Sequence, residues 1–183
     1  MVTFFTYITY MRHMEVYTDG SSVPNPGVGG WGWVSYEGMS VKMVIRSYGG
    51  LKTTTNNQME LMAMAEFLES CPYGISANIY SDSMYVLGGI IGQNVKELTR
   101  VQAKPQGWMR GWLRFNSTID TSSASYWNKE IKNAEEWYRI HQSLLKHAKG
   151  KSILNFCWVK GHSNSEGNEE ADRLSNLFRI ENS

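Results

Sequence analysis

The sequence predicts an α/β protein with a five-stranded mixed sheet, in which three antiparallel strands are followed by parallel strands, flanked by helices. Strand-like alternation occurs three times near the start of the chain, a helical repeat then precedes a fourth strand, and a fifth strand lies between two further helices. Strands joined by short turns pair antiparallel, whereas a strand that follows a helical crossover pairs in parallel.

The first three strands are expected over residues 15–18, 30–36 and 41–48. In the second strand, Trp31 and Trp33 face one side and small residues face the other, which is the alternation of a strand in a sheet. Glycine-rich turns join the three segments, so they are expected to form an antiparallel unit.

A helix and a short strand should follow. Apolar residues recur at helical spacing after a Thr/Asn cluster that supplies the N-cap, and they are Leu61, Met64, Ala65 and Leu68. The helix is expected to end at 71–74, ahead of a strand over 75–81. Ser81 or Asp82 should cap a second helix that carries Tyr85.

The second half of the chain begins with an irregular region. Residues 92–125 are polar and lack a clear period, after which helical spacing resumes over 126–149. A last strand is expected over 153–159 and a last helix over 167–179.

Length and composition indicate one folded domain over 15–183, with an N-terminal extension over 1–14 and an inserted basic protrusion around 93–125. The chain has 183 residues, which leaves too little for a second core, and its 42% hydrophobic content excludes a disordered protein. The two cysteines are too few for a disulfide framework or a thiolate zinc site, so we expect free thiols in a reducing compartment.

Charge and hydropathy indicate which classes of protein this chain can belong to. The net charge of +1 does not mark a nucleic-acid binder, although five basic residues and one acid lie between Lys96 and Arg114. No run reaches the roughly 20 apolar residues of a spanning helix, and the apolar start lacks the basic leader of a signal peptide. We expect a soluble monomer in the cytoplasm, or in the host cytoplasm if the source is viral.

Five polar residues are candidates for a site: Asp19, Glu60, Asp82, His162 and Asp172. Taken singly, most have an ordinary explanation, because Asp-Gly is a turn signal, acids suit the first turn of a helix or its N-cap, and loop histidines are commonly solvated. Asp172 lies beside apolar residues in a helix, where an acid is harder to explain. Asp19 and Asp82 lie at the carboxyl ends of adjacent parallel strands, which point to one place.

Acids brought together at one place repel one another unless a multivalent cation is bound. Oxygen ligands without cysteine or paired histidines select Mg²⁺ or Mn²⁺. Two such ions about 4 Å apart can clamp the attacking and leaving oxygens of a phosphoryl displacement. The sequence has no Ser/His/Asp order, Walker loop or CxxC pair that would indicate a competing chemistry.

Four blocks of sequence together resemble a known family. They are Tyr17-Thr18-Asp19-Gly20-Ser21, Thr55-Asn56-Asn57-Gln58-Met59-Glu60-Leu61, Tyr80-Ser81-Asp82-Ser83 and Trp158-Val159-Lys160-Gly161-His162, the last followed by Gly167-Asn168-Glu169 and Ala171-Asp172. In order and spacing they resemble type 1 ribonuclease H, the endonuclease that cuts the RNA strand of an RNA–DNA hybrid, over residues 15–178. The resemblance implies the ribonuclease H-like fold.

The resemblance also implies roles for the candidates. The ligands of two Mg²⁺ ions, which Mn²⁺ can replace, would be Asp19, Glu60, Asp82 and Asp172. His162 would shuttle protons or assist product release, which suits a group that titrates near neutrality. Glu169 matches a family acid near the metal site. The products would carry 5′-phosphate and 3′-hydroxyl ends, and the activity would remove RNA primers or hybrids.

Further positions match family contacts to the hybrid. Asn25, Asn56 and Asn57 match residues in the minor groove, where polar side chains can read the RNA 2′-hydroxyl. Thr55 matches a residue that grips a DNA-strand phosphate, and Ser22 matches a substrate contact in the glycine-rich loop.

The basic segment resembles the substrate-binding protrusion of the bacterial enzymes. Its residues are Trp108, Arg110, Trp112 and Arg114. Tryptophan can pack on sugars while arginine pairs with phosphates. The alternative is that both tryptophans pack onto the long helix that follows.

Two departures from the family pattern stand out. Met84 occupies a position where bacterial members often have a hybrid-contacting glutamine, and a thioether cannot make the same hydrogen bonds. The span from Asp82 to His162 is also longer than usual. Two alternatives to a nuclease are a non-cleaving hybrid-binding module, which would not need four acids, and a strand-transfer or junction-resolving enzyme, which would lack the Asn-Asn and Gly-His blocks.

Overall fold

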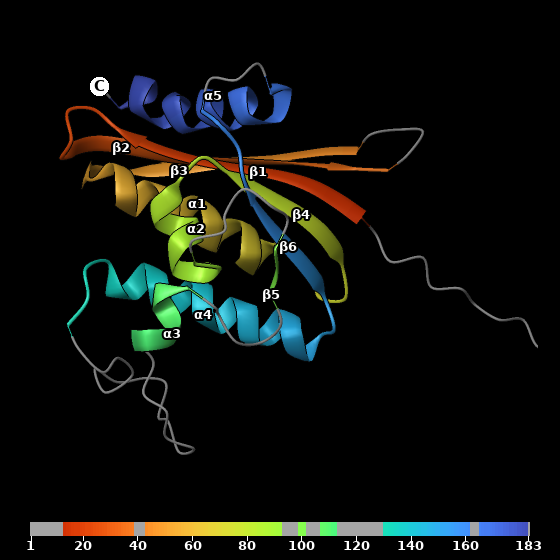
Figure 1. Ribbon diagram of the computed structural model, residues 1–183. Helices are drawn as coiled ribbons and strands as arrows, with labels where there is room; N and C mark the ends of the chain where they lie inside the picture. The colour runs from red at the N-terminus through yellow and green to blue at the C-terminus, as the bar shows by residue number, and fades with distance from the viewer. Residues whose placement is uncertain are drawn as a thin grey trace, which may run out of the picture.

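The computed structural model describes residues 13–38, 43–92, 99–101, 107–112, 130–161 and 165–182 (Figure 1). The elements are β1 (His13–Ser22), β2 (Gly27–Glu37), β3 (Met43–Thr54), α1 (Asn56–Ser70), β4 (Ser76–Ser81), α2 (Met84–Ile90), β5 (Thr99–Val101), α3 (Trp108–Trp112), α4 (Ala134–Lys149), β6 (Ile153–Trp158) and α5 (Glu166–Glu181). Strand β1 begins at His13, inside the range expected for the N-terminal extension.

The strands form one mixed sheet in the order β3-β2-β1-β4-β6-β5. Pairing is antiparallel from β3 to β1 and parallel from β1 through β4 to β6, which confirms the predicted five-stranded arrangement. A sixth short strand, β5, pairs antiparallel with β6 and extends that edge. This region was expected from the sequence to be irregular. Strand β5 was missed because three residues are too few to show a strand period.

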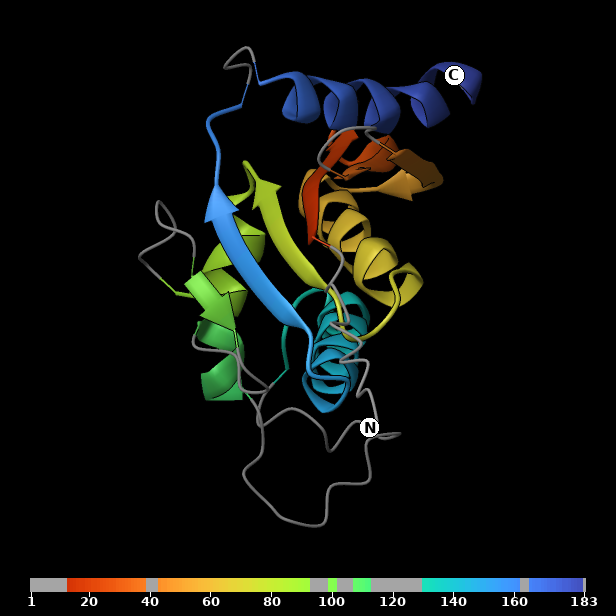
Figure 2. The same cartoon turned by 90° about the vertical axis from the view of Figure 1, so that its right-hand side faces the viewer.

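Helices cover both faces of the sheet. Figure 1 shows α5 on one face and α1, α2 and α4 on the other, and Figure 2 shows the same separation after a quarter turn. Strand β2 serves both faces as its alternation predicted. Trp33 packs edge-on against Phe67 of α1 at 5.6 Å between ring centroids. A Cβ on Gly30 would meet the Ser175 carbonyl oxygen of α5 at 2.1 Å, so the bare glycine backbone allows α5 to approach.

The main core lies between the sheet and α1. The four apolar residues predicted to form the buried stripe of α1 are all fully buried. Met59 and Phe67 are fully buried as well, so α1 is enclosed on more than one side. Thr55 is the N-cap, with its Oγ1 accepting from the Gln58 amide at 3.3 Å, as the Thr/Asn cluster predicted.

The two C-terminal helices differ in how well the sequence predicted them. Helix α5 covers the expected range with one or two extra residues at each end. Helix α4 begins at Ala134, so the predicted start at 126 is wrong for the described residues 130–133. The cause is Asn133, whose backbone is left-handed with φ 57° and therefore cannot continue an α-helix toward the N-terminus.

Cys71 and Cys157 are free, as expected. Within the described parts of the chain, no helix combines the length and apolar character that crossing a membrane requires.

Two histidines of α4 are expected to contribute a loss of stability in mild acid. Burial lowers the pKa of His141 to about 4 and lowers the pKa of His147. Because each histidine binds its proton more tightly in the unfolded chain than in the folded one, the two contribute a loss in the free energy of unfolding from about pH 6.5 toward pH 4, opposite in sign to the contribution of Asp19, whose pKa is raised. Urea unfolding at about pH 7.5 and about pH 5 measures this contribution as the difference in pH slope between wild type and His141→Phe. His141→Phe should make the loss smaller, and an unchanged pH slope in that variant would contradict the prediction.

Candidate active site

Two of the candidate acids lie side by side at the end of the parallel pairing. The last parallel pair between β1 and β4 joins Thr18 to Ser81. Asp19 and Asp82 each follow directly, which places both acids at the edge that the sequence predicted. Strand β1 itself continues to Ser22 through its pairing with β2, so Asp19 lies within the strand and is held on one side by β2.

Glu60 reaches this edge because α1 packs closely on β1. A Cβ on Gly20 would lie 2.2 Å from the Met59 carbonyl carbon and 2.3 Å from the Glu60 nitrogen, so backbone touches backbone here. Ser83 then fixes the acid, since its Oγ donates to Glu60 Oε2 at 2.5 Å. The same oxygen accepts from the Val86 amide at 3.2 Å as the N-cap of α2.

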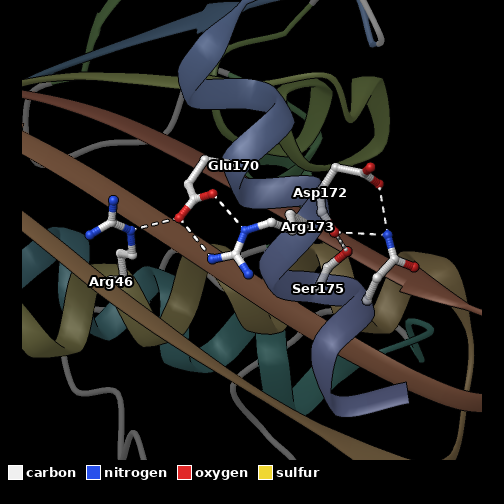
Figure 3. Close-up of polar contacts among 6 residues, drawn as sticks. Arg46, Glu170, Asp172, Arg173 and Ser175 are labelled. Carbon is white, nitrogen blue, oxygen red and sulfur yellow. Dashed lines mark hydrogen bonds and ion pairs between the residues drawn. The ribbon is translucent and has the colours of Figure 1, made fainter. Parts of the chain in front are cut away.

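Asp172 approaches from the opposite face on α5. Ser175, one turn later, donates through Oγ to Asp19 Oδ2 at 2.9 Å and also lies 2.9 Å from the Asp172 carbonyl oxygen. Figure 3 shows Asp172 and Ser175 on the same helix, with the contact between Ser175 and the Asp172 carbonyl oxygen drawn. A fully buried hydroxyl therefore connects the helix of one acid to the carboxylate of another.

The acids influence one another electrostatically. The pKa of Asp19 is raised to about 7, first by burial and next by the charge of Asp82, while the hydrogen bond from Ser175 opposes the rise and the charge of Asp172 adds to it. The pKa of Glu60 is also raised, first by burial, with the Ser83 hydrogen bond opposing and the charge of Asp82 contributing. Asp19 thus senses two other candidate acids.

The donor set fits a hard divalent cation. All four acids supply carboxylate oxygens, and a bound cation would relieve the repulsion that, after burial, raises the pKa of Asp19. Among the described residues, no three His, Cys, Asp or Glu side chains are close enough to hold an ion as they stand. The structure therefore brings the acids to one region without closing them on a point.

The loop after β6 runs past Asp82. A Cβ on Gly161 would meet Asp82 Oδ2 at 2.7 Å, and Trp158 Nε1 donates to the Asp82 carbonyl oxygen at 2.9 Å. His162, the next residue, lies outside the described residues. Glu169 lies in the first turn of α5, where its side chain is exposed.

Three of the expected hybrid contacts form one hydrogen-bonded cluster. Asn56 Oδ1 accepts from the Ser22 amide at 2.6 Å and from Ser22 Oγ at 3.1 Å. Asn25 Oδ1 accepts from the Asn56 amide and from Ser22 Oγ, both at 3.3 Å. Thr55 caps the same helix, and Asn57 is exposed beside it. Both cluster asparagines use their oxygens internally, so their NH₂ groups are the atoms that can face a ligand.

The expected protrusion is described only in α3. Trp112 packs edge-on against Trp137 of α4 at 5.5 Å, so for this residue the alternative of packing on the long helix is what the structure shows. Trp108 remains 44% exposed and lies 6.0 Å from the Tyr85 ring of α2. Arg110 is exposed, and Arg114 lies outside the described residues.

Sequence reasoning missed the serines that hold the acids. Ser83 was visible only as part of a matched block, and Ser175 was not identified at all. Its one signal was its position three residues after Asp172, on the same side of a helix. Met84, identified as a departure from the family pattern, is 51% exposed at the start of α2, two residues after Asp82.

A family model and curated relatives of this chain all belong to one family. The RNase H family model matches residues 11–177. A protein named Ribonuclease H from Hahella chejuensis is 36% identical over 167 residues, which span 91% of this chain and 93% of that protein. The Ribonuclease H of Cupriavidus metallidurans is 35% identical over 167 residues, with coverage of 91% and 94%.

Solved structures share the fold. The crystal structure of an RNase H1 called LC11, in complex with RNA/DNA hybrid, superposes with a TM-score of 0.60 at 20% identity and covers 93% of this chain and 99% of that one. The RNase H1 of the halophilic archaeon Halobacterium salinarum gives 0.55 at 19% identity, with coverage of 92% and 98%.

Proposed function

The chain belongs to the ribonuclease H family, and on that premise we propose that it is an endonuclease that hydrolyses the RNA strand of RNA–DNA hybrids. One observation carries the proposal: Asp19 and Asp82 follow the last residues of the β1–β4 parallel pairing. Glu60 is held close by Ser83, and Ser175 links the helix of Asp172 to Asp19. A module that only binds a hybrid has no need of acids that repel one another.

The four acids are proposed to hold two Mg²⁺ ions, which Mn²⁺ can replace. When bound, such ions supply stabilisation of the negative charge that develops on the attacking and leaving oxygens. Ser83 and Ser175 each donate to an acid, which orients Glu60 and Asp19. Hydrolysis of the bond between phosphorus and the 3′-oxygen would leave 5′-phosphate and 3′-hydroxyl ends, as suits removal of RNA primers or hybrids.

His162 is proposed to carry a proton at this centre or to assist product release. It follows Gly161, whose Cα lies against Asp82 Oδ2 so closely that a Cβ would come within 2.7 Å. An imidazole that titrates near neutrality suits the transfer of a proton to the departing 3′-oxygen. Glu169 is proposed as a second acid near the same edge.

Recognition of the hybrid is proposed to use two surfaces. The NH₂ groups of Asn25 and Asn56 can donate to minor-groove acceptors, including the 2′-hydroxyl that marks the RNA strand. Ser22, Thr55 and Asn57 lie in or beside this cluster. The second surface is the protrusion, where Trp108 offers an exposed ring. Arg110 and Arg114 are proposed to contact phosphates beside it, whereas Trp112, expected from the sequence as a further contact, packs against Trp137 instead.

End-labelled substrates test the function directly. The protein is mixed with an RNA–DNA hybrid, an RNA–RNA duplex and a DNA–DNA duplex, each with Mg²⁺ and with EDTA. We expect cutting of the RNA strand of the hybrid alone, and only with Mg²⁺. Hybrid binding without cutting under Mg²⁺ or Mn²⁺ would instead identify a binding module, and cutting of duplex DNA would identify a strand-transfer or junction-resolving enzyme.

A further inference from the structure

An arginine on α5 is connected to two of the candidate acids by hydrogen bonds that run through the side chains between them. Arg179 is in the last turns of the helix, seven residues after Asp172. One of its nitrogens, Nη1, donates to Ser21 Oγ at 3.2 Å and also to Asn176 Oδ1. Neither Ser21 nor Asn176 is an acid. Two branches of hydrogen bonds therefore start at the Arg179 guanidinium, and each continues through neutral side chains.

The first branch leads to Asp19. Ser21 Oγ lies 3.3 Å from Ser175 Oγ, which lies 2.9 Å from Asp19 Oδ2. An arginine side chain can only donate, so Ser21 must accept from it and has its own proton left for Ser175. The Ser175 proton then goes to the carboxylate, which is a stronger acceptor than the Asp172 carbonyl at the same distance. Every donor in this branch therefore points toward Asp19.

The second branch leads to Asp172. Because Arg179 can only donate, Asn176 must turn its amide oxygen toward the arginine. The amide NH₂ then faces back along the helix and donates to Asp172 Oδ1 at 3.2 Å and to the Asp172 carbonyl oxygen at 2.8 Å. The contact with Arg179 therefore favours the one orientation of Asn176 that offers a donor to Asp172.

We propose that Arg179 is a positioning residue that fixes the carboxylates of Asp19 and Asp172 for divalent-cation binding, through Ser21 and Ser175 on one branch and Asn176 on the other. The inference rests on the proposed function, since it concerns the same acids. Hydrogen bonds to a ligand carboxylate restrict its rotamers before the ion arrives, which lowers the cost of assembling the site.

The same helix carries a matched control. Arg173 pairs with Glu170, with its Nε 2.7 Å from Glu170 Oε2, and Arg46 of β3 contacts the other oxygen of that acid. Figure 3 shows this group of ion pairs on one side of α5 and Asp172 on the other. Loss of Arg173 removes one positive charge and one polar network from α5, as loss of Arg179 does, but the hydrogen bonds of Arg173 within the described residues go to Glu170, which is not a candidate acid.

The test measures Mn²⁺ binding by titration calorimetry, without nucleic acid, for wild type, Arg179→Ala, Arg179→Lys, Ser175→Ala and Arg173→Ala. We expect Arg179→Ala to weaken Mn²⁺ binding roughly 10-fold and Ser175→Ala, which breaks only one branch, to weaken it less. Lysine should restore part of the affinity because its ammonium group also only donates. Arg173→Ala should bind Mn²⁺ as wild type does.

Steady-state cleavage supplies a second readout. We expect Arg179→Ala to lower kcat while KM for the hybrid stays close to that of wild type. A raised KM with unchanged Mn²⁺ affinity would overturn the inference, because it would make Arg179 a contact to the hybrid. Equal Mn²⁺ affinity in Arg179→Ala, Ser175→Ala and Arg173→Ala would overturn it while leaving the proposed function standing. A wild-type protein that binds no Mn²⁺ and does not cut the hybrid would overturn the proposed function itself.

Discussion

Replacing Asp19 by asparagine is expected to abolish cleavage and, at the same time, to stabilise the protein in the absence of a divalent cation. The folded protein raises the pKa of this acid from 3.8 to about 7, first through burial and then through the charge of Asp82. The folded state therefore binds the proton more tightly than the unfolded state, and stability falls as pH rises from about 4 to about 7. Asparagine carries no charge, so the variant escapes this cost.

The two effects have opposite signs and different sizes. In EDTA near neutral pH, we expect Asp19→Asn to raise the free energy of unfolding by about 2 kcal/mol. Cleavage with Mg²⁺ should fall by roughly 1,000-fold, because a ligand carboxylate worth several kcal/mol in the transition state is missing. Urea unfolding in EDTA and cleavage of the labelled hybrid measure the two effects on the same preparations.

The control for this prediction is Glu130→Gln, which neutralises an exposed acid ahead of α4. It should change neither quantity appreciably. An Asp19→Asn protein that still cuts the hybrid at the wild-type rate would show that Asp19 is not a ligand. A variant less stable than wild type in EDTA would show that the buried carboxylate is not a source of repulsion in the folded protein.

The sequence was sufficient to predict where Asp19 and Asp82 lie, because strand topology alone decides it. Strand alternation and the helical crossover placed β1 and β4 side by side and parallel, and parallel neighbours end at the same edge. The register then brings Asp19 and Asp82 together without any information about side-chain packing. The same holds for the alternation of β2, whose tryptophans were predicted to face one side of the sheet and whose small residues were predicted to face the other.

The residues that hold the acids could not be predicted in this way. Ser175, Asn176 and Arg179 are common helix-surface residues in sequence, and their role depends on how closely α5 approaches β1. That approach depends on bare backbone at positions such as Gly32, where a Cβ would lie 2.5 Å from Leu174 Cβ. Hydrogen-bond partners separated by more than 150 positions in the chain, such as Ser175 and Asp19, leave no periodic signal.

Local features that leave no periodic pattern are a second reason why the sequence did not predict every element. Strand β5 is three residues long and is defined by its partner β6, and a strand that short has no alternation of its own. Asn133 has a left-handed backbone and so prevents α4 from beginning earlier in the chain. In the sequence it is only one more polar residue in a helical pattern. Trp112 was consistent with a substrate-facing or a core position, and only its contact with Trp137 decides between them.

Gly20→Ala is expected to damage both the fold and the site. A Cβ at this position would lie 2.2 Å from the Met59 carbonyl carbon and 2.6 Å from the Met59 carbonyl oxygen, and these backbone atoms cannot rotate away as a side chain can. Helix α1 must shift from β1, taking Glu60 with it. We expect a loss of about 3 kcal/mol in the free energy of unfolding, because overpacking here strains two elements. Cleavage should fall roughly 100-fold, since displacing a catalytic group by about 1 Å costs that much.

Gly111→Ala separates this steric effect from the general consequences of replacing glycine. Gly111 lies in α3, where no atom of the described residues outside this helix is within 4 Å of the added Cβ. Alanine is a better helix former than glycine, so this variant should be as stable as wild type or more stable by up to about 1 kcal/mol. Urea unfolding and hybrid cleavage compare the two variants. If Gly20→Ala kept wild-type cleavage despite a lower stability, Glu60 would not depend on the close contact of α1 with β1. If it matched Gly111→Ala in both measurements, that contact would not be required for the fold either.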